Sequence, residues 1–293
     1  MHIPTKKLEN GFELPVYGMG LARVGGNTEP DTSQDDAWTK AIQQAIENGV
    51  THFDTAEVYG GGHCEELLGR AIKGIERDKL VIASKVAASH QSYDGVRKSC
   101  EASLKRLQTD YIDLYMLHRY PEPGTPIADT MRAMTELVDE GLIKQIGVSN
   151  LTVNRFKAAQ AATPHKVVCN QLHYNVQFRE AEHRGIVEYS QQNDIFVVAW
   201  KPVQRGELPD ATILDELATK YGKTWRQVAI NWLISQDHVV TICKTSSLEH
   251  LQENLGALDW TMEPKDIERI RAEFPNQEKV GNWPLDYDAD VQP

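Results

Sequence analysis

Short apolar runs alternate along the chain with longer segments in which apolar residues recur every three or four positions. The short runs are typical of buried β-strands, and the periodic segments are typical of amphipathic helices. Strands are predicted over residues 17–21, 50–53, 80–85, 112–117, 144–148, 167–170, 195–200 and 239–242. Helices are predicted over residues 31–48, 65–74, 93–107, 127–140, 153–162, 180–192, 211–221, 225–235, 248–255 and 264–274.

This order predicts an α/β fold, a single parallel (β/α)8 TIM barrel that spans residues 1–293. An N-terminal β-hairpin is expected over residues 3–15, because Asn10-Gly11 is a strong turn signal, and extra helices are expected at the C-terminal end. The main alternative is a doubly wound sheet that binds a dinucleotide, which requires Gly-x-Gly-x-x-Gly after the first strand. Here Gly18-Met19-Gly20 is followed by Leu21-Ala22-Arg23, so that motif is absent.

Polar side chains stand at or just beyond the predicted carboxyl ends of six strands. They are Asp54, Lys85, His118, Asn150, Gln171 and Lys244. A parallel barrel gathers these strand ends around one mouth, where barrel enzymes carry their active sites. One such residue alone is explained by packing or by a turn, but six in register predict a functional site.

Composition narrows the range of functions. A net charge of −11 and a pI of about 5.4 argue against non-specific binding to nucleic acid or to an anionic membrane. The four cysteines are scattered, with no Cys-x-x-Cys pair, which predicts reduced thiols and no zinc site. The N-terminus resembles no signal peptide and no apolar run could cross a bilayer, so a cytoplasmic protein is expected.

The stretch from Val50 to Tyr59 brings a carboxylate, Asp54, and a phenol, Tyr59, to one strand end. A phenol has a pKa near ~10 and is a weak acid at neutral pH, but a buried ammonium beside it favours the phenolate. Lys85 is expected to lower the pKa of Tyr59 in this way, while Asp54 keeps Lys85 charged. His118 can then orient a substrate carbonyl. These groups supply protons but no electrons, so a redox cofactor is needed.

The segments His52 to Gly60, Ser84-Lys85, Leu117-His118 and Ile146 to Asn150 resemble the aldo-keto reductase superfamily over nearly the whole chain. The resemblance implies reduction of an aldehyde or ketone by NADPH, with a catalytic tetrad of Asp54, Tyr59, Lys85 and His118. It also implies a nicotinamide site at the barrel mouth. That site consists of Ser149, Asn150 and Gln171 for the carboxamide, Trp200 for stacking on the ring, and the following Lys201, Pro202 and Val203.

The other end of the cofactor is expected at the last loop and helix, where a helix N-terminus can bind phosphate. The residues that the resemblance assigns there are Lys244, Thr245, Ser246, His250, Glu253 and Asn254. The family usually has an arginine where His250 stands, so NADPH is expected to be preferred over NADH by a reduced margin, with NADH as a weaker alternative. A Ser/Thr cluster that caps the helix is compatible with the same role.

The substrate is expected to be a small carbonyl compound, bound by a monomer or small homo-oligomer. The residues predicted to contact it are Arg23, Tyr59, His118, Arg119 and Trp200, with Tyr120, Trp283 and Tyr287 as further pocket walls. Arg23 and Arg119 either favour a substrate with a carboxylate or are surface charges.

Two alternatives of other classes remain. One is a non-catalytic NADP(H)-binding redox sensor, which could retain the whole tetrad. The other is an aldolase that forms a Schiff base at Lys85. A metal-dependent hydrolase is disfavoured because the sequence contains no His-x-His pair.

Overall fold

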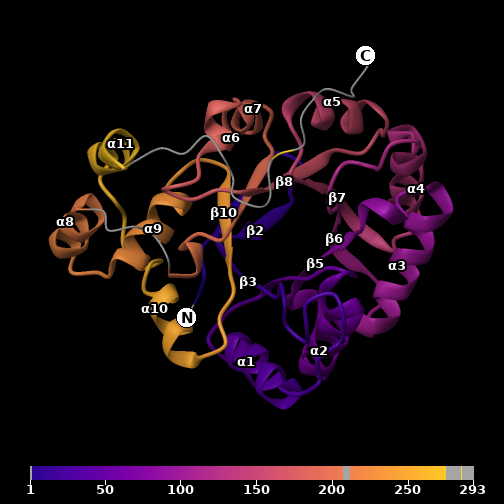
Figure 1. Cartoon of the computed structure of the whole chain (residues 1–293), viewed down its shortest axis with the longest axis horizontal. Coiled ribbons are helices and arrows are strands. Elements are labelled where there is room, and N and C mark those ends of the chain that lie inside the picture. Colours follow the sequence, from indigo (N-terminus) through magenta and orange to yellow (C-terminus); the bar gives the residue numbers. More distant parts are fainter. Residues whose placement is uncertain (1, 207–211, 275–284, 286–293) are drawn as a thin grey trace.

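Eight parallel strands form a closed barrel at the centre of the molecule (Figure 1). The computed structural model describes residues 2–206, 212–274 and 285. The order around the barrel follows the chain, and the last strand pairs with the first. The strands are β3 (Tyr17–Gly20), β4 (His52–Asp54), β5 (Val81–Val86), β6 (Ile112–Leu117), β7 (Ile143–Ser149), β8 (Val167–His173), β9 (Phe196–Trp200) and β10 (Val239–Cys243). The predicted TIM barrel is therefore confirmed.

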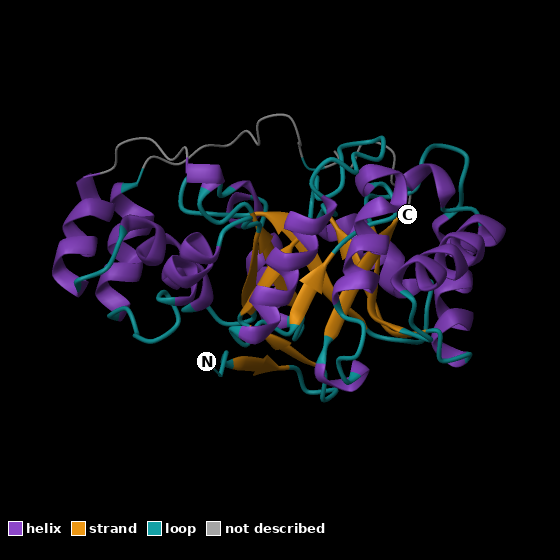
Figure 2. Cartoon of the chain, turned by 90° about the horizontal axis from the view of Figure 1, so that it is seen from below, coloured by secondary structure: helices purple, strands orange, loops and turns teal. Residues whose placement is uncertain are grey.

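Helices surround the strands on the outside of the barrel (Figures 1 and 2). They are α1 (Asp35–Glu47), α2 (His63–Ala71), α3 (Tyr93–Leu107), α4 (Ile127–Asp139), α5 (Val153–Ala161), α6 (Glu180–His183), α7 (Ile186–Gln192), α8 (Thr212–Tyr221), α9 (Trp225–Ile234), α10 (Leu248–Leu255) and α11 (Pro264–Glu273). The single helix predicted over 180–192 is wrong. Gly185 adopts a φ of 65° between α6 and α7 and breaks the segment into two helices.

The predicted N-terminal hairpin closes the end of the barrel where the strands begin (Figure 2). It consists of β1 (Thr5–Lys7) and β2 (Glu13–Pro15). Leu8 and Leu14 are buried in the same apolar cluster as Leu114 of β6. Burying a leucine side chain contributes roughly 1.5–3 kcal/mol. The hairpin therefore seals this end, which we call the floor, and leaves the other end, the mouth, for a site.

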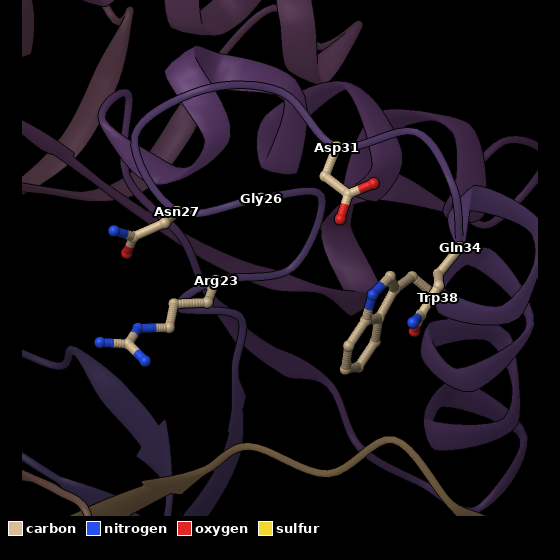
Figure 3. Close-up of a pocket in the computed structure, with 6 residues that line it drawn as sticks. All are labelled: Arg23, Gly26, Asn27, Asp31, Gln34 and Trp38. Carbon is tan, nitrogen blue, oxygen red and sulfur yellow. The ribbon is translucent and has the colours of Figure 1, made fainter.

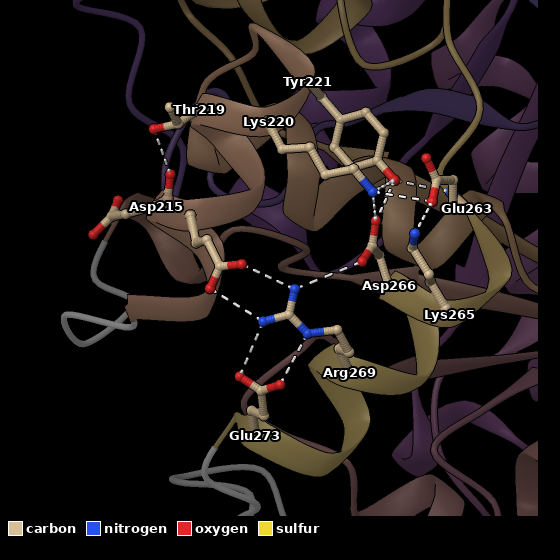
Figure 4. A network of polar contacts seen from close by, with 10 residues as sticks. Asp215, Thr219, Lys220, Tyr221, Glu263, Lys265, Asp266, Arg269 and Glu273 are labelled. Carbon is tan, nitrogen blue, oxygen red and sulfur yellow. Dashed lines mark hydrogen bonds and ion pairs between the residues drawn. The ribbon is translucent and has the colours of Figure 1, made fainter.

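A polar network fastens the outer helices α8 and α11 together (Figure 4). Asp266 of α11 accepts hydrogen bonds from Lys220 and Tyr221 at the end of α8. Arg269 forms ion pairs with Glu216 of α8 and with Glu273 one turn further along α11. These contacts lie away from the strand ends, so they stabilise the periphery of the barrel.

Some predictions fall on residues outside the part that the structure describes. The predicted pocket walls Trp283 and Tyr287 lie there, as do residues 207–209 of the connection after the seventh strand. Within the described part, no helix combines the length and apolar character needed to span a membrane.

Candidate active site

The centre of the mouth is a buried ion pair between two strand ends. Asp54 is the last residue of β4, and Lys85 is the penultimate residue of β5. Lys85 Nζ lies 2.7 Å from Asp54 Oδ1 and donates a second hydrogen bond, also of 2.7 Å, to the carbonyl oxygen of Thr55. Both side chains are buried: that of Lys85 is 0% exposed and that of Asp54 is 3% exposed. Because an unpaired charge at such depth is costly, the lysine and the carboxylate stabilise each other.

Tyr59 and His118 lie above this pair and are both partly exposed. Their rings meet edge to face, with centroids 5.6 Å apart and an interplanar angle of 82°. Lys85 Nζ lies 5.1 Å from the centroid of the Tyr59 ring. The structure therefore brings the four residues of the predicted tetrad together as a buried charged layer beneath an accessible layer of two proton-bearing rings.

Burial and charge shift the pKa values of this cluster. Burial alone would lower the pKa of Lys85, but Asp54 and Tyr59 outweigh it, and the net shift is upward. Lys85 is thus held as an ammonium, whereas a Schiff-base lysine must be neutral to attack a carbonyl. Burial lowers the pKa of His118 to about 3, helped by the charges of Lys85 and Arg119, so its imidazole is neutral at physiological pH.

One expectation about Tyr59 is wrong. Its pKa was expected to lie below the ordinary value because of Lys85, but burial raises the pKa of Tyr59 by more than the ammonium lowers it. Lys85 therefore limits the rise instead of reversing it. The phenol therefore remains protonated over the whole physiological range.

Polar side chains near the ends of β7 and β8 are connected to the tetrad by hydrogen bonds. Gln171 Nε2 donates to the second carboxylate oxygen of Asp54 at 2.7 Å. Ser149 Oγ donates to the backbone carbonyl of Gln171 at 3.0 Å, and Asn150 Nδ2 donates to Ser149 Oγ at 2.8 Å. All three predicted carboxamide residues are buried and adjacent, so they form one hydrogen-bonded row beside Asp54.

Trp200, at the end of β9, belongs to a stack of three rings that the sequence did not predict. His173 lies parallel to Trp200, with centroids 4.3 Å apart and an interplanar angle of 11°. Phe178 covers the other side of His173, with centroids 4.6 Å apart. Lys201 Nζ lies 5.0 Å from the Trp200 ring. The stack fixes the plane of the indole at the mouth. Of the predicted residues that follow Trp200 and Lys201, Pro202 is buried and Val203 is partly buried.

The loop between β10 and α10 presents the residues predicted for phosphate. Lys244 and Ser246 are exposed, while Thr245 is buried and donates from Oγ1 to the Ser247 carbonyl oxygen. Ser247 is the N-cap of α10 and accepts a hydrogen bond from the His250 backbone N–H. The Lys244 ammonium lies 4.7 Å from the centroid of the Trp38 ring in α1.

Three further residues predicted at this end of the cofactor lie along α10, and two of them are bound by the protein itself. His250 is exposed on the first turn of α10. Glu253 pairs with Arg226 at 3.6 Å, and Asn254 is buried, with its amide donating to the Tyr17 hydroxyl at 3.3 Å. His250 and Glu253 therefore lie on the accessible side of α10, and Asn254 lies on its inner side.

Arg23 lies at the edge of a pocket of about 290 Å3 beside the mouth (Figure 3). The side chains of Arg23 and Asn27 stand on one side of this pocket, and those of Asp31, Gln34 and Trp38 stand on the other. Arg119 follows His118 and is partly buried, and its backbone carbonyl accepts a hydrogen bond from the Gln91 side chain. Arg23 is therefore an exposed charge at the rim, and Arg119 lies beside the tetrad.

No group of three His, Cys, Asp or Glu side chains that could hold a metal ion occurs among the described residues. All four cysteines are free and buried. Among the described residues, the candidate site at the mouth is therefore the predicted tetrad with the polar residues beside it.

Comparison with known proteins identifies the family of this chain. A sequence model of the Aldo/keto reductase family matches residues 17–273. The chain is 34% identical over 283 residues to the glyoxal reductase of Bacillus subtilis (strain 168), covering 96% of each chain. The chain therefore belongs to the aldo-keto reductase family.

Two solved structures extend the comparison. The thermostable aldo-keto reductase Tm1743, in complex with the inhibitor epalrestat, is 40% identical with a TM-score of 0.90, over 92% of this chain and 99% of that one. An aldo-keto reductase from Klebsiella pneumoniae, in complex with NADPH, is 33% identical with a TM-score of 0.84, over 98% of this chain and 100% of that one. This chain is thus an oxidoreductase by family, and it shares its fold with these two aldo-keto reductases.

Proposed function

We propose that this protein reduces the carbonyl group of a small aldehyde or ketone to an alcohol, with NADPH as cofactor and Tyr59 as the general acid. The observation that carries the proposal is the buried Lys85–Asp54 pair directly beneath the partly exposed Tyr59 and His118. This arrangement keeps a fixed positive charge beside a protonated phenol at an accessible mouth. Two relatives support the same chemistry: one is named glyoxal reductase, and the other was solved in complex with NADPH.

The residues at the mouth fit both ends of NADPH. Hydroxyl and amide groups of Ser149, Asn150 and Gln171 match the hydrogen-bonding needs of a carboxamide, and the fixed indole of Trp200 offers an aromatic plane. At the far end, the exposed ammonium of Lys244 precedes the N-terminus of α10, a combination that suits a phosphate. NADPH, when bound, supplies a hydride for the carbonyl carbon.

Each member of the tetrad has a separate task in this reaction. Tyr59 donates its phenolic proton to the carbonyl oxygen, which completes the alcohol. Lys85 stabilises the phenolate that remains, and Asp54 holds Lys85 charged and in place. Because the pKa of His118 is about 3, its neutral imidazole carries a single N–H, which orients the carbonyl oxygen.

The proposal is tested by steady-state oxidation of NADPH and NADH with glyoxal and a panel of simple aldehydes, ketones and keto acids. We expect multiple turnovers with at least one small aldehyde and a preference for NADPH. Tight NADPH binding without turnover on any member of the panel would contradict the proposal and favour the redox-sensor alternative.

A further inference from the structure

A second buried carboxylate, Glu65, lies close to the tetrad but does not belong to it. Glu65 stands in the first turn of α2 and is fully buried. Its Oε1 accepts a hydrogen bond of 2.5 Å from Ser84 Oγ, and its Oε2 accepts one of 2.7 Å from Arg106 Nε. Arg106 also donates from Nη2 to Ser103 Oγ at 3.2 Å within α3. Glu65 thus connects α2, β5 and α3 at one point.

Two of these connections are adjacent in sequence to tetrad residues. Ser84 immediately precedes Lys85 in β5, so the hydroxyl that binds Glu65 sits on the strand that carries the ammonium. On the other side, the backbone N–H of His63, the first residue of α2, donates to the carbonyls of Tyr59 and Gly60. The segment that carries Tyr59 therefore continues without a break into the helical turn that carries Glu65.

The turn between Tyr59 and α2 consists of three glycines that pack tightly against their neighbours. All three have positive φ, from 57° to 97°. A Cβ on Gly62 would lie 2.7 Å from Arg106 Nε, and a Cβ on Gly60 would lie 2.3 Å from the carbonyl oxygen of Gly25. Arg106 is therefore in contact with the turn and with Glu65 at the same time, which fixes the turn from the α3 side.

We propose that Glu65, Ser84 and Arg106 are positioning residues that hold Tyr59 at its working distance from Lys85. The expected effect on the reaction rate rests on the proposed function, whereas the effect on the position of Tyr59 does not. Glu65 joins the backbone on the Lys85 side to the backbone on the Tyr59 side, and Arg106 stabilises the carboxylate and supports the glycine turn. The hydrogen bonds and ion pair of these three side chains go to one another and to Ser103, not to a tetrad side chain, so they act through the placement of Tyr59 and Lys85.

The opposite end of β5 offers a matched control. Asp113, at 7% exposure, binds Arg77 Nη2 at 2.6 Å and accepts a hydrogen bond of 3.0 Å from the backbone N–H of Ile82. This pair is also a buried carboxylate held by an arginine and tied to β5, but it lies at the floor. If the Glu65 network served stability alone, substitutions in the two networks would have the same kinetic effect.

The kinetic test compares Glu65→Gln, Ser84→Ala and Asp113→Asn by single-turnover reduction at saturating NADPH, together with NADPH affinity and thermal unfolding. Misplacement of a reacting group by about 1 Å can reduce a rate by ~10²-fold. We expect Glu65→Gln to slow the single turnover by roughly 10- to 100-fold and Ser84→Ala by a smaller factor, with NADPH affinity unchanged. Asp113→Asn should lower the unfolding temperature while its single-turnover rate stays within about twofold of the unmutated protein.

A readout that needs no turnover is the NMR signal of the Tyr59 ring in protein with 13C-labelled tyrosine, assigned with Tyr59→Phe. The signal should shift in Glu65→Gln and Ser84→Ala and stay in place in Asp113→Asn. Ser84→Ala removes a single hydroxyl and keeps the Glu65–Arg106 ion pair, so it serves if Glu65→Gln does not fold.

The outcomes separate the two proposals. An unshifted Tyr59 signal and an unchanged rate in the folded variants would overturn the positioning role. A loss of single-turnover rate in Asp113→Asn equal to that in Glu65→Gln would also overturn the positioning role, because the rate would then depend on the stability of the fold. A shifted signal in a protein that never turns over would support the positioning role and contradict the proposed function.

Discussion

The two ends of the barrel are built from the same strands but use their polar groups differently. At the floor, Lys6 Nζ donates to the backbone carbonyls of Ile234, Gln236 and Val239 at 2.5–2.8 Å. At the mouth, the Lys85 ammonium also donates hydrogen bonds, to Asp54 and to the Thr55 carbonyl. Unlike Lys6, it lies next to the partly exposed rings of Tyr59 and His118.

This difference shows how a barrel separates stability from chemistry. The floor lysine in β1 binds backbone carbonyls at and beyond the end of α9 and so fastens the hairpin, and its charge is expected to affect the fold alone. The mouth lysine lies beside partly exposed rings, and in the proposed mechanism its charge stabilises the phenolate of Tyr59. A lysine whose ammonium is fully hydrogen-bonded is therefore not a sign of function by itself, and the side chains around it decide its role.

The largest expected effect comes from removing the proposed proton donor at the mouth, the Tyr59 hydroxyl. Tyr59→Phe should lower kcat by roughly 10²- to 10⁴-fold and leave NADPH binding nearly intact, because the phenol acts only as an acid. The matched control is Tyr115→Phe in β6, since the buried Tyr115 hydroxyl has no hydrogen-bond partner in the described structure. Steady-state kinetics at saturating cofactor measure both. Near-normal turnover in Tyr59→Phe would disprove the mechanism.

The comparison of the two lysines can be tested directly. Lys85→Met should abolish most turnover and, because it leaves Asp54 buried and unpaired, destabilise the fold by about 3–5 kcal/mol. Lys6→Met should destabilise the fold by roughly 1–3 kcal/mol through the loss of its hydrogen bonds, with kcat unchanged. Urea unfolding and steady-state kinetics measure these effects. A fall in kcat for Lys6→Met would show that the floor is coupled to the chemistry.

A smaller effect is expected from His52, which begins the strand that Asp54 ends. His52 is fully buried, and burial lowers its pKa from 6.5 to about 4. Between these two pH values the unfolded chain binds a proton at His52 that the folded chain does not. Stability therefore decreases as the pH falls through this window, by about 3 kcal/mol from this residue.

Urea unfolding of the unmutated protein and of His52→Asn at pH 7 and pH 4.5 measures this contribution. Asparagine does not titrate, so the variant should lose less stability on acidification than the unmutated protein. Equal losses in the two proteins would show that the imidazole is protonated in the folded state.

The smallest expected effect concerns His250 at the rim of the mouth. His250 is exposed and carries a positive charge only when protonated, whereas an arginine is always charged and matches phosphate geometry. His250→Arg should tighten NADPH binding by about fivefold, as expected for an exposed ion pair, and leave NADH binding almost unchanged. Fluorescence titration with both cofactors measures this. Equal tightening of NADH would show that residue 250 does not read the 2′-phosphate.

The sequence alone determined the barrel and the composition of its mouth. Strands and helices depend on local periodicity, which a single chain displays directly. A parallel barrel brings the carboxyl ends of its strands together, so the sequence alone places Asp54, Lys85 and His118 at the same mouth. The error in the helix boundaries is local as well: a positive φ at Gly185 divides one predicted helix into two.

Only the tertiary structure decided how the grouped residues act. The direction of the Tyr59 pKa shift depends on the balance between burial and the opposite charges of Lys85 and Asp54, and a sequence gives neither depth nor distance. The link from Glu65 to Ser84 and Arg106 joins residues 19 and 41 positions away in the chain, at spacings that follow no motif. Periodicity specifies which side chains face the core, but contacts between distant segments exist only after the barrel has closed.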